Sequence, residues 1–292
     1  MPARFDAPPS LLAALTLLIL AAPTLAAQGE NATLAARLAA ERPIAARPSP
    51  WLEELTWMEV RDAIAAGTTT VIVPTGGIEE NGPFLATGKH DYILEATCPV
   101  LAAKLGDTLC APIVKFVPEG DIDPPTGAMR FPGTLSLRQE TYEALLEDLA
   151  GSLKQAGFTD VVLLGDSGGN QRGMANVAER LNARWAEDPA RVHFVREFYD
   201  PGWEATEQFT ARELGVEETR HDGHHDDIWV TAMMMVVDPR HVRYEERLAA
   251  DLASINGVPI APAEETIELG RRMIEFRAKM TAEAIRAAID GP

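Results

Sequence analysis

The sequence predicts an α/β protein in which a mostly parallel sheet is covered by helices on both faces, a three-layer α/β/α arrangement. Short apolar runs that suit buried strands alternate with longer segments of helical periodicity. Two of the helical segments stop at Gly106 and Gly157, as helices commonly do. The 292 residues have a hydrophobic content of 46%, which is enough to bury one ordinary core.

Strands and helices follow one another from residue 71 to the end of the chain. Apolar runs predict strands at residues 71–73, 109–114, 161–164 and 192–198. Helical spacing predicts helices at residues 92–105, 139–156, 171–185, 229–237 and 264–289. Residues 117–129 and 199–227 are too long and irregular for ordinary connections, so we expect active-site loops there.

The first 27 residues have the pattern of a secretory signal peptide. An apolar run from Leu11 to Ala22 precedes a cleavage region of small residues, and the run is too short to span a bilayer. We therefore expect a periplasmic or secreted protein with no membrane association after cleavage. Residues 28–50 would form a tether and residues 51–292 one domain. In that compartment Cys98 and Cys110 either pair or remain buried thiols, and the sequence leaves both open.

The chain is strongly acidic, with a formal net charge of −18. Nucleic-acid binding needs clustered lysine and arginine side chains to neutralise phosphates, so this charge argues against a nucleic-acid partner. Acidity of this kind favours solubility.

The most informative segment is Gly76 to Pro83, a glycine-rich turn that directly follows the apolar run at residues 70–74. Open α/β sheets bind ligands at the carboxyl ends of their strands, so we expect Glu79 and the nearby His90-Asp91 pair to belong to a site. A second segment, His221 to Asp227, is dense in imidazole and carboxylate groups. Such groups are ligands of zinc, manganese or iron. The sequence therefore predicts a transition-metal site.

The Gly76 to Pro83 segment with His90-Asp91 resembles the first metal-binding motif of the creatininase (creatinine amidohydrolase) family, a Glu-Gln-His-Gly-Pro-His stretch with a nearby Asp. Residues 131–137 are similar to the family's Phe-Pro-Gly-Thr segment, and residues 165–170 to its Asn-Gly-His-Gly-Gly-Asn turn. The His224-His225 pair stands where the family has its catalytic histidine. The resemblance covers residues 50–240 in the same order and implies a creatininase-like fold.

This chain departs from the family pattern at several positions. Asn81 and Ser167 replace ligand histidines, His90 stands in the place of the usual bridging Asp, and Val230 takes the place of a common Glu. The chain therefore resembles a divergent member. Imidazole rarely bridges two ions, so His90 predicts a single metal ion, and we expect this residue on a loop outside the core.

The resemblance implies a metal-dependent hydrolase that acts on an amide or cyclic amide C–N bond of a small molecule. The expected ligands are Glu79, His90, Asp166 and Asp91, for a divalent transition metal, with zinc ahead of manganese or iron. His225 would move a proton to the leaving nitrogen, and His224 or Asp226 would orient it or complete the metal shell. The expected substrate-binding residues are Asn81, Ser167, Asn170 and Trp229. The family's ring-shaped oligomers imply a homo-oligomer, in many cases a hexamer.

Three residues outside this set have simpler interpretations. We interpret Lys89 as a solvated turn residue rather than a substrate contact. His193, inside a predicted strand, and His241, after a Pro-Arg turn, are interpreted as structural.

Two other functions remain open. The pentapeptide from Gly165 to Gly169 also fits the Gly-x-Ser-x-Gly nucleophile elbow, with a strand before it and a helix after it, which would make Ser167 a serine-hydrolase nucleophile. The replaced ligands at positions 81, 167 and 230 also fit a non-catalytic relative that binds a small molecule. Metal content separates this binding protein from a hydrolase.

Overall fold

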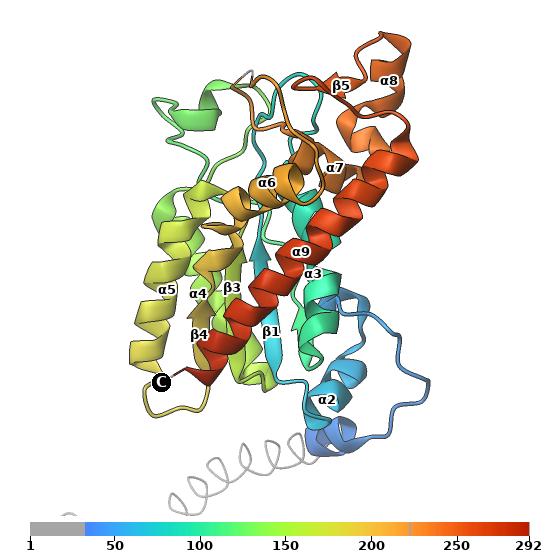
Figure 1. Cartoon of the computed structure of the whole chain (residues 1–292). Coiled ribbons are helices and arrows are strands. Elements are labelled where there is room, and N and C mark those ends of the chain that lie inside the picture. Colours follow the sequence, from blue (N-terminus) through green and yellow to red (C-terminus); the bar gives the residue numbers. More distant parts are fainter. Residues whose placement is uncertain (1–32, 222, 292) are drawn as a thin grey trace, which may run out of the picture. The chain divides into compact units, whose positions relative to one another are not determined.

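The computed structural model describes residues 33–221 and 223–291 (Figure 1). The predicted signal peptide lies outside these described residues. The chain divides into two compact units, one ending at Ala46 and the other beginning at Arg47. In the first unit, residues 33–39 are helical. Among the described helices, none is long and apolar enough to cross a membrane.

Four parallel strands form the central sheet of the second unit, in the order β2-β1-β3-β4. Their bounds are Thr108–Cys110 for β2, Thr70–Thr75 for β1, Asp160–Gly165 for β3 and Arg191–Phe194 for β4. Every residue of β1 is buried, as expected for a strand between two helical layers. Thr70 lies opposite Asp160 and Thr75 opposite Gly165, so β1 and β3 end at the same level.

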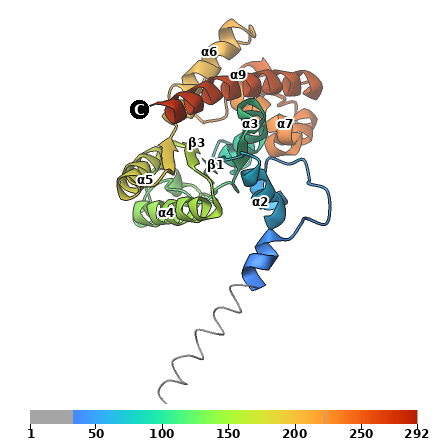
Figure 2. The ribbon, with the colours of Figure 1, turned by 90° about the horizontal axis from the view of Figure 1, so that it is seen from below.

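Alternate side chains of β1 enter two separate cores, because successive residues of a strand point to opposite faces. Val71 and Val73 pack with α2 (Trp57–Ala65), α4 (Gln139–Ala156) and α5 (Gln171–Arg184). Ile72 packs with α3 (Lys89–Leu105) and α9 (Ala263–Asp290). Figure 2 shows α4 and α5 on one side of the strands and α3 and α9 on the other. The predicted three-layer α/β/α class is confirmed.

A third apolar cluster surrounds α7 (Ile228–Val237), which buries eight of its ten residues. α7 packs against α3 and α9. A Cβ at Gly270 of α9 would lie 2.2 Å from the Ala232 carbonyl oxygen, so this close crossing requires glycine. The remaining elements are α6 (Gly202–Arg212), α8 (Tyr244–Ala249), the hairpin of β5 (Ser254–Ile255) and β6 (Val258–Pro259), and the short 3-10 helices Leu52–Glu54, Gly127–Arg130, Gly168–Asn170, Arg196–Phe198 and Pro239–Val242.

Two predictions about loops were wrong. Helix α3 begins at Lys89 rather than at residue 92, so His90 is not on a loop outside the core but in the first helical turn, where it is 2% exposed. Asp91 is also in this turn, where an acidic residue suits the positive end of the helix. Residues 199–227 are not irregular throughout, because α6 lies within them and buries Thr206 and Thr210 against its neighbours.

The two cysteines are buried and free in the structure. Cys110 Sγ donates a hydrogen bond to the Cys98 carbonyl oxygen at 3.4 Å. Of the two states that the sequence leaves open, the structure contains the thiols.

Candidate metal centre

The predicted site segments meet at the carboxyl ends of β1 and β3, where an open α/β sheet places its ligands. Gly76 follows β1 and leads to Glu79, while Asp166 directly follows β3. Because Thr75 and Gly165 are paired, both segments leave the sheet at the same level. The first turn of α3 then brings His90 between them.

The two glycines after β1 leave room for carboxylates that lie against the backbone. A Cβ at Gly77 would lie 2.1 Å from Glu119 Oε1, and one at Gly76 would lie 1.9 Å from Asp91 Oδ1. Gly77 also has a φ of +157°, which side-chain-bearing residues rarely adopt. The glycine pair therefore makes room for the site.

His90 connects two carboxylates through its two ring nitrogens. Its Nε2 lies 2.8 Å from Glu79 Oε1, and its Nδ1 lies 2.7 Å from Asp166 Oδ2. Burial and the charge of Lys89 lower the pKa of the imidazole, but the contacts with Asp166 and Glu79 outweigh them and raise it. Burial alone would raise the pKa of Glu79; the hydrogen bonding of His225 and His90 and the charge of Lys89 hold it well below its usual value.

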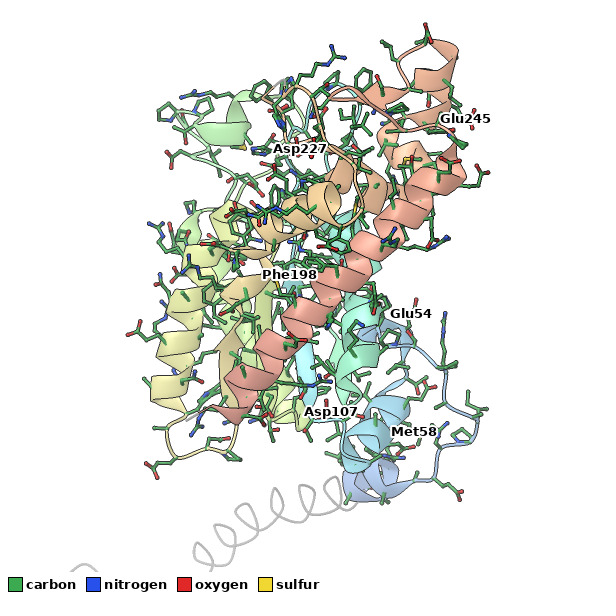
Figure 3. The ribbon with its side chains drawn as sticks, viewed as in Figure 1. Glu54, Met58, Asp107, Phe198, Asp227 and Glu245 are labelled. Atoms are coloured by element: carbon green, nitrogen blue, oxygen red, sulfur yellow. The ribbon has the colours of Figure 1, made fainter. Side chains whose placement is uncertain are left out.

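Asp166 is held from behind by Arg277 of α9. Both side chains are fully buried, and Arg277 Nη2 donates to Asp166 Oδ1 at 2.6 Å. The same guanidinium donates to the Phe198 carbonyl oxygen at 2.8 Å and lies 3.9 Å from the ring centroid of Phe198, which is labelled in Figure 3. Burial opposes ionisation of Asp166, but the Arg277 charge and the His90 hydrogen bond lower its pKa to about 2. Asp166 is therefore an ionised partner that orients His90.

Glu119 is the third acidic residue of the centre and comes from the irregular segment after β2. It is 8% exposed, and its Oε2 accepts a hydrogen bond from Ser167 Oγ at 3.0 Å. Its buried Oε1 has no hydrogen-bond partner in the part of the chain that the structure describes. Burial raises the pKa of this carboxyl to about 7, with the charge of Glu79 adding to the effect and that of His90 opposing it.

Glu79, His90 and Glu119 together form a donor set for a metal ion. One ligand atom from each lies within 4.8 Å of the others, and all three residues are buried. Two carboxylates and an imidazole suit a divalent transition metal, and three protein ligands leave a position for water or substrate, as in catalytic zinc sites. The unpartnered Glu119 Oε1 is the atom that a cation would satisfy. The residues present therefore fit one divalent ion.

Two of the predicted ligands lie outside this set. Both oxygens of Asp166 are engaged by His90 and Arg277. Asp91 Oδ1 accepts from the Gly77 backbone N–H at 3.3 Å, and burial raises the pKa of Asp91 to about 6. The structure thus places Asp166 behind His90 and Asp91 against the glycine turn.

The histidine-rich segment reaches the centre through His225. Its Nδ1 lies 3.7 Å from Glu79 Oε1, and its side chain is 64% exposed, so it lies at the solvent side of the centre. His224 faces Glu80, with Nδ1 and Oε2 3.7 Å apart. Asp226 is fully buried close to Gly82, where an added Cβ would lie 3.1 Å from Asp226 Oδ2. Among the three predicted catalytic residues, His225 lies against Glu79 of the donor set, whereas His224 lies against Glu80 and Asp226 lies beside Gly82.

An aromatic ring of α6 lies on the same side, with a ring of α7 packed behind it. Trp203 lies 5.9 Å from His90 and 6.3 Å from His225 between ring centroids. The predicted substrate residue Trp229 is 2% exposed and packs edge-on against Trp203 at 4.9 Å. Trp229 is thus a core residue behind Trp203, and the half-buried ring next to His90 and His225 is Trp203 of α6.

The predicted substrate-binding polar residues mainly support the backbone of the centre. Asn81 Nδ2 donates to the Glu79 carbonyl oxygen at 2.9 Å. Asn170 Nδ2 donates to the carbonyl oxygens of Thr75 and Gly76, each at 2.9 Å, which fixes the start of the glycine turn. Both side chains are buried, with exposed fractions of 1% and 0%.

A second group of possible ligands, Glu218, His221 and Asp227, lies in the segment before α7. The space between its carboxylates is already filled, because Asn256 Nδ2 lies 2.9 Å from Glu218 Oε1 and 3.2 Å from Asp227 Oδ1. Glu79, His90 and Glu119 are therefore the better candidate metal centre.

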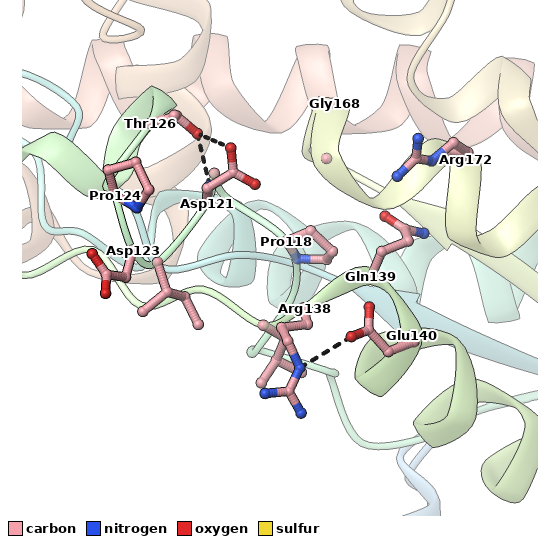
Figure 4. Close-up of a pocket in the computed structure, with 14 residues that line it drawn as sticks. Pro118, Asp121, Asp123, Pro124, Thr126, Arg138, Gln139, Glu140, Gly168 and Arg172 are labelled. Atoms are coloured by element: carbon pink, nitrogen blue, oxygen red, sulfur yellow. Dashed lines mark hydrogen bonds and ion pairs between the residues drawn. The ribbon is translucent and has the colours of Figure 1, made fainter.

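A cavity of about 890 Å³ lies beside the Gly168-Gly169 turn (Figure 4). It is lined by Pro118 and Gly120, which flank Glu119, and by Arg172 of α5. Its position next to the Glu119 backbone makes it a neighbour of the centre, although Glu79 and His90 do not line it.

Sequence reasoning missed three residues of this centre. Glu119 lies in the stretch predicted as an active-site loop, so its position was a usable signal, but no motif marks it. Lys89 is not a solvated turn residue: it is fully buried, and its Nζ lies 3.1 Å from Glu79 Oε1. Arg277 comes from the last helix, and nothing in its local sequence indicates a contact with Asp166.

This chain is similar to known proteins both in sequence and in structure. The sequence model of the family described as creatininase, creatinine amidohydrolase, matches residues 53–285, which is more than half of the chain. A creatinine amidohydrolase of Pseudomonas putida is 28% identical over 116 residues, and this match spans 40% of the present chain and 44% of that enzyme's length. A manganese creatininase structure superposes with a TM-score of 0.61 and 22% identity, covering 82% of this chain and 98% of that one. A mutant creatininase of the Zn-Zn type gives a TM-score of 0.60 with the same identity and coverage.

Proposed function

Since this chain belongs to the creatininase family, we propose that it is a metal-dependent amidohydrolase that cleaves an amide or cyclic amide C–N bond of a small molecule. The observation that carries this proposal is the buried donor set of Glu79, His90 and Glu119 at the carboxyl edge of the sheet. The Zn-Zn and manganese forms among its structural relatives support a divalent transition metal. Zinc is the metal that we propose first, because imidazole and carboxylate together suit it.

Each residue of the centre has a distinct part in this chemistry. A divalent ion held here would lower the pKa of a bound water and polarise the substrate carbonyl. His90 would hold the ion through Nε2, while the ionised Asp166 fixes its ring through Nδ1. Glu119 would contribute Oε1 and is kept in place by the Ser167 hydroxyl.

His225 is the residue that we propose for proton transfer. It lies at the solvent side, 3.7 Å from Glu79 and beside Trp203, where a substrate would enter. An imidazole in this position can deliver a proton to the nitrogen that leaves when the C–N bond breaks. Trp203 would then cover one face of a small planar substrate.

A serine mechanism fits the structure less well. The serine of a nucleophile elbow is exposed on a strained turn. Ser167 is 4% exposed and has φ −100° and ψ 148°, which is ordinary extended backbone. Its hydroxyl is used to hold Glu119.

The test is hydrolysis of a panel of small linear and cyclic amides by the purified protein, before and after chelation. Chelation should abolish turnover, and added Zn²⁺ or Mn²⁺ should restore it. Ser167→Ala should keep measurable turnover, because the hydroxyl supports a ligand and does not attack the substrate. Turnover that survives chelation and is lost in Ser167→Ala would contradict the proposal. A protein that binds these amides without metal and without turnover would identify a silent relative.

A further inference from the structure

Lys89 places its ammonium group inside the metal centre. Its side chain is completely buried, its Nζ lies 3.1 Å from Glu79 Oε1, and the same ammonium is 5.3 Å from the ring centroid of Trp203. Lysine is almost never fully buried unless it is paired, and its neighbours here are metal-binding carboxylates. A residue in this position affects which ions the centre accepts.

The charges around Lys89 balance for one divalent ion. Glu79, Glu119 and Asp166 supply three negative charges when ionised, and Lys89 and Arg277 supply two positive ones. One negative charge remains. With a single divalent ion, these five side chains and the ion would have a net charge of +1, which a bound hydroxide would neutralise. With a second divalent ion the net charge, before any hydroxide, would be +3 in a buried space. Such an excess is strongly unfavourable at low dielectric constant.

The contacts of Glu79 Oε1 also favour a single ion beside this oxygen. A carboxylate that bridges two ions must offer an oxygen to each. Oε1 of Glu79 is already contacted by Lys89 Nζ at 3.1 Å and by His90 Nε2 at 2.8 Å. A metal ion that binds His90 Nε2 would replace the contact between His90 and Glu79. The contact between Lys89 Nζ and Glu79 Oε1 would remain.

We propose that the Lys89 ammonium takes the place of a second metal ion beside Glu79, so that this centre holds one divalent ion. The inference rests on the proposed function, because it presumes that Glu79, His90 and Glu119 bind metal. In this arrangement Lys89 is a positioning residue: it holds the Glu79 carboxylate without being removable by a chelator.

Zinc titration of the full chain tests this inference. The protein is first stripped with a chelator, and zinc uptake is then measured by calorimetry and by elemental analysis after gel filtration. The unmutated protein should take up one zinc per chain. Lys89→Met keeps the length of the side chain but removes its charge, so the zinc dissociation constant should fall by about tenfold or a second equivalent should bind. Lys89→Arg keeps the charge and should still take up one equivalent.

The outcomes separate this inference from the proposed function. Two equivalents in the unmutated protein would overturn the role of Lys89 and leave the hydrolase standing. No zinc uptake at all would overturn both. Folded Lys89→Met, checked by circular dichroism, with unchanged or weaker affinity and one equivalent would also overturn the role of Lys89. If Lys89→Met does not fold, Lys89→Gln is titrated in the same way, and the stoichiometry of the unmutated protein remains decisive.

Discussion

At the scale of single residues, His90 contacts both acidic partners that converge on the centre, and both of its ring nitrogens are engaged. Its position in the first turn of α3 rather than on a loop changes what its removal should do. Loss of the ring would remove a metal ligand and would also leave Asp166 and Glu79 without a buried partner. Metal binding and stability should therefore fall together.

His90→Ala should lose most bound metal, with affinity reduced more than about 100-fold. It should also lose roughly 2–5 kcal/mol of unfolding free energy, because a partner of two buried carboxylates is removed. Metal analysis and urea unfolding measure the two effects. His193→Ala is the control, since His193 pairs with Asp160 on the sheet, 2.9 Å away, and this variant should keep its metal. Full metal occupancy in His90→Ala would contradict the ligand assignment.

Glu119 gives a pH-dependent prediction for the metal-free protein. Its folded pKa of about 7 lies above the ordinary value of 4.5 for a glutamate side chain. Its ionisation therefore costs stability that grows as pH rises from the unfolded value through the folded value. Glu119→Gln should remove this cost, so the chelated variant should be more stable than the chelated unmutated protein at pH 8 by roughly 1–3 kcal/mol.

At pH 4 the two chelated proteins should have equal stability, because both carry a neutral group. With metal present the order should reverse, since Gln is a much poorer ligand than a carboxylate. Thermal unfolding with and without chelator measures which of the two proteins is more stable in each state. Equal stability of the chelated proteins at pH 8 would show that burial does not hold Glu119 neutral.

At the scale of elements, the turn between β1 and α3 determines whether the centre can form. Gly77→Ala should lose metal binding, because its Cβ would take the place of Glu119 Oε1. Gly106→Ala is a matched control: Gly106 also has a positive φ, +91°, but an added Cβ there meets no atom within 4 Å. The control should lose about 1 kcal/mol of stability and keep its metal. Equal metal loss in both variants would point to backbone strain rather than to a displaced carboxylate.

The elements that could be predicted from sequence are those with a strong local pattern. The helix at residues 139–156 has the bounds that its spacing predicted, because amphipathic periodicity and Gly157 specify both ends. The start of α3 was missed because Lys89, His90 and Asp91 are polar residues in a buried turn, where their partners lie far away in the sequence. Glu79 and His90 could be found from a motif. Glu119 and Arg277 could not, because only the folded chain brings the segment after β2 and helix α9 next to β1 and α3.

At the scale of the whole molecule, the N-terminal segment carries a prediction about the compartment. The apolar run before Pro23 precedes small residues, so the mature protein should begin near Ala27 or Gln28 and be exported. N-terminal sequencing of protein recovered from the periplasm or medium checks the cleavage site. An intact Met1 on exported protein would contradict it. We also propose a homo-oligomer on the basis of the family resemblance, and sedimentation of the mature protein measures its size.

The central claim is that one divalent ion binds at the meeting point of β1, α3 and the segment that carries Glu119. The most direct measurement is a crystal structure of the zinc-loaded protein with anomalous diffraction recorded on both sides of the zinc edge. The account predicts one anomalous peak per chain, within coordination distance of Glu79, His90 and Glu119. No peak there, or a peak at Glu218, His221 and Asp227 in its place, would contradict it.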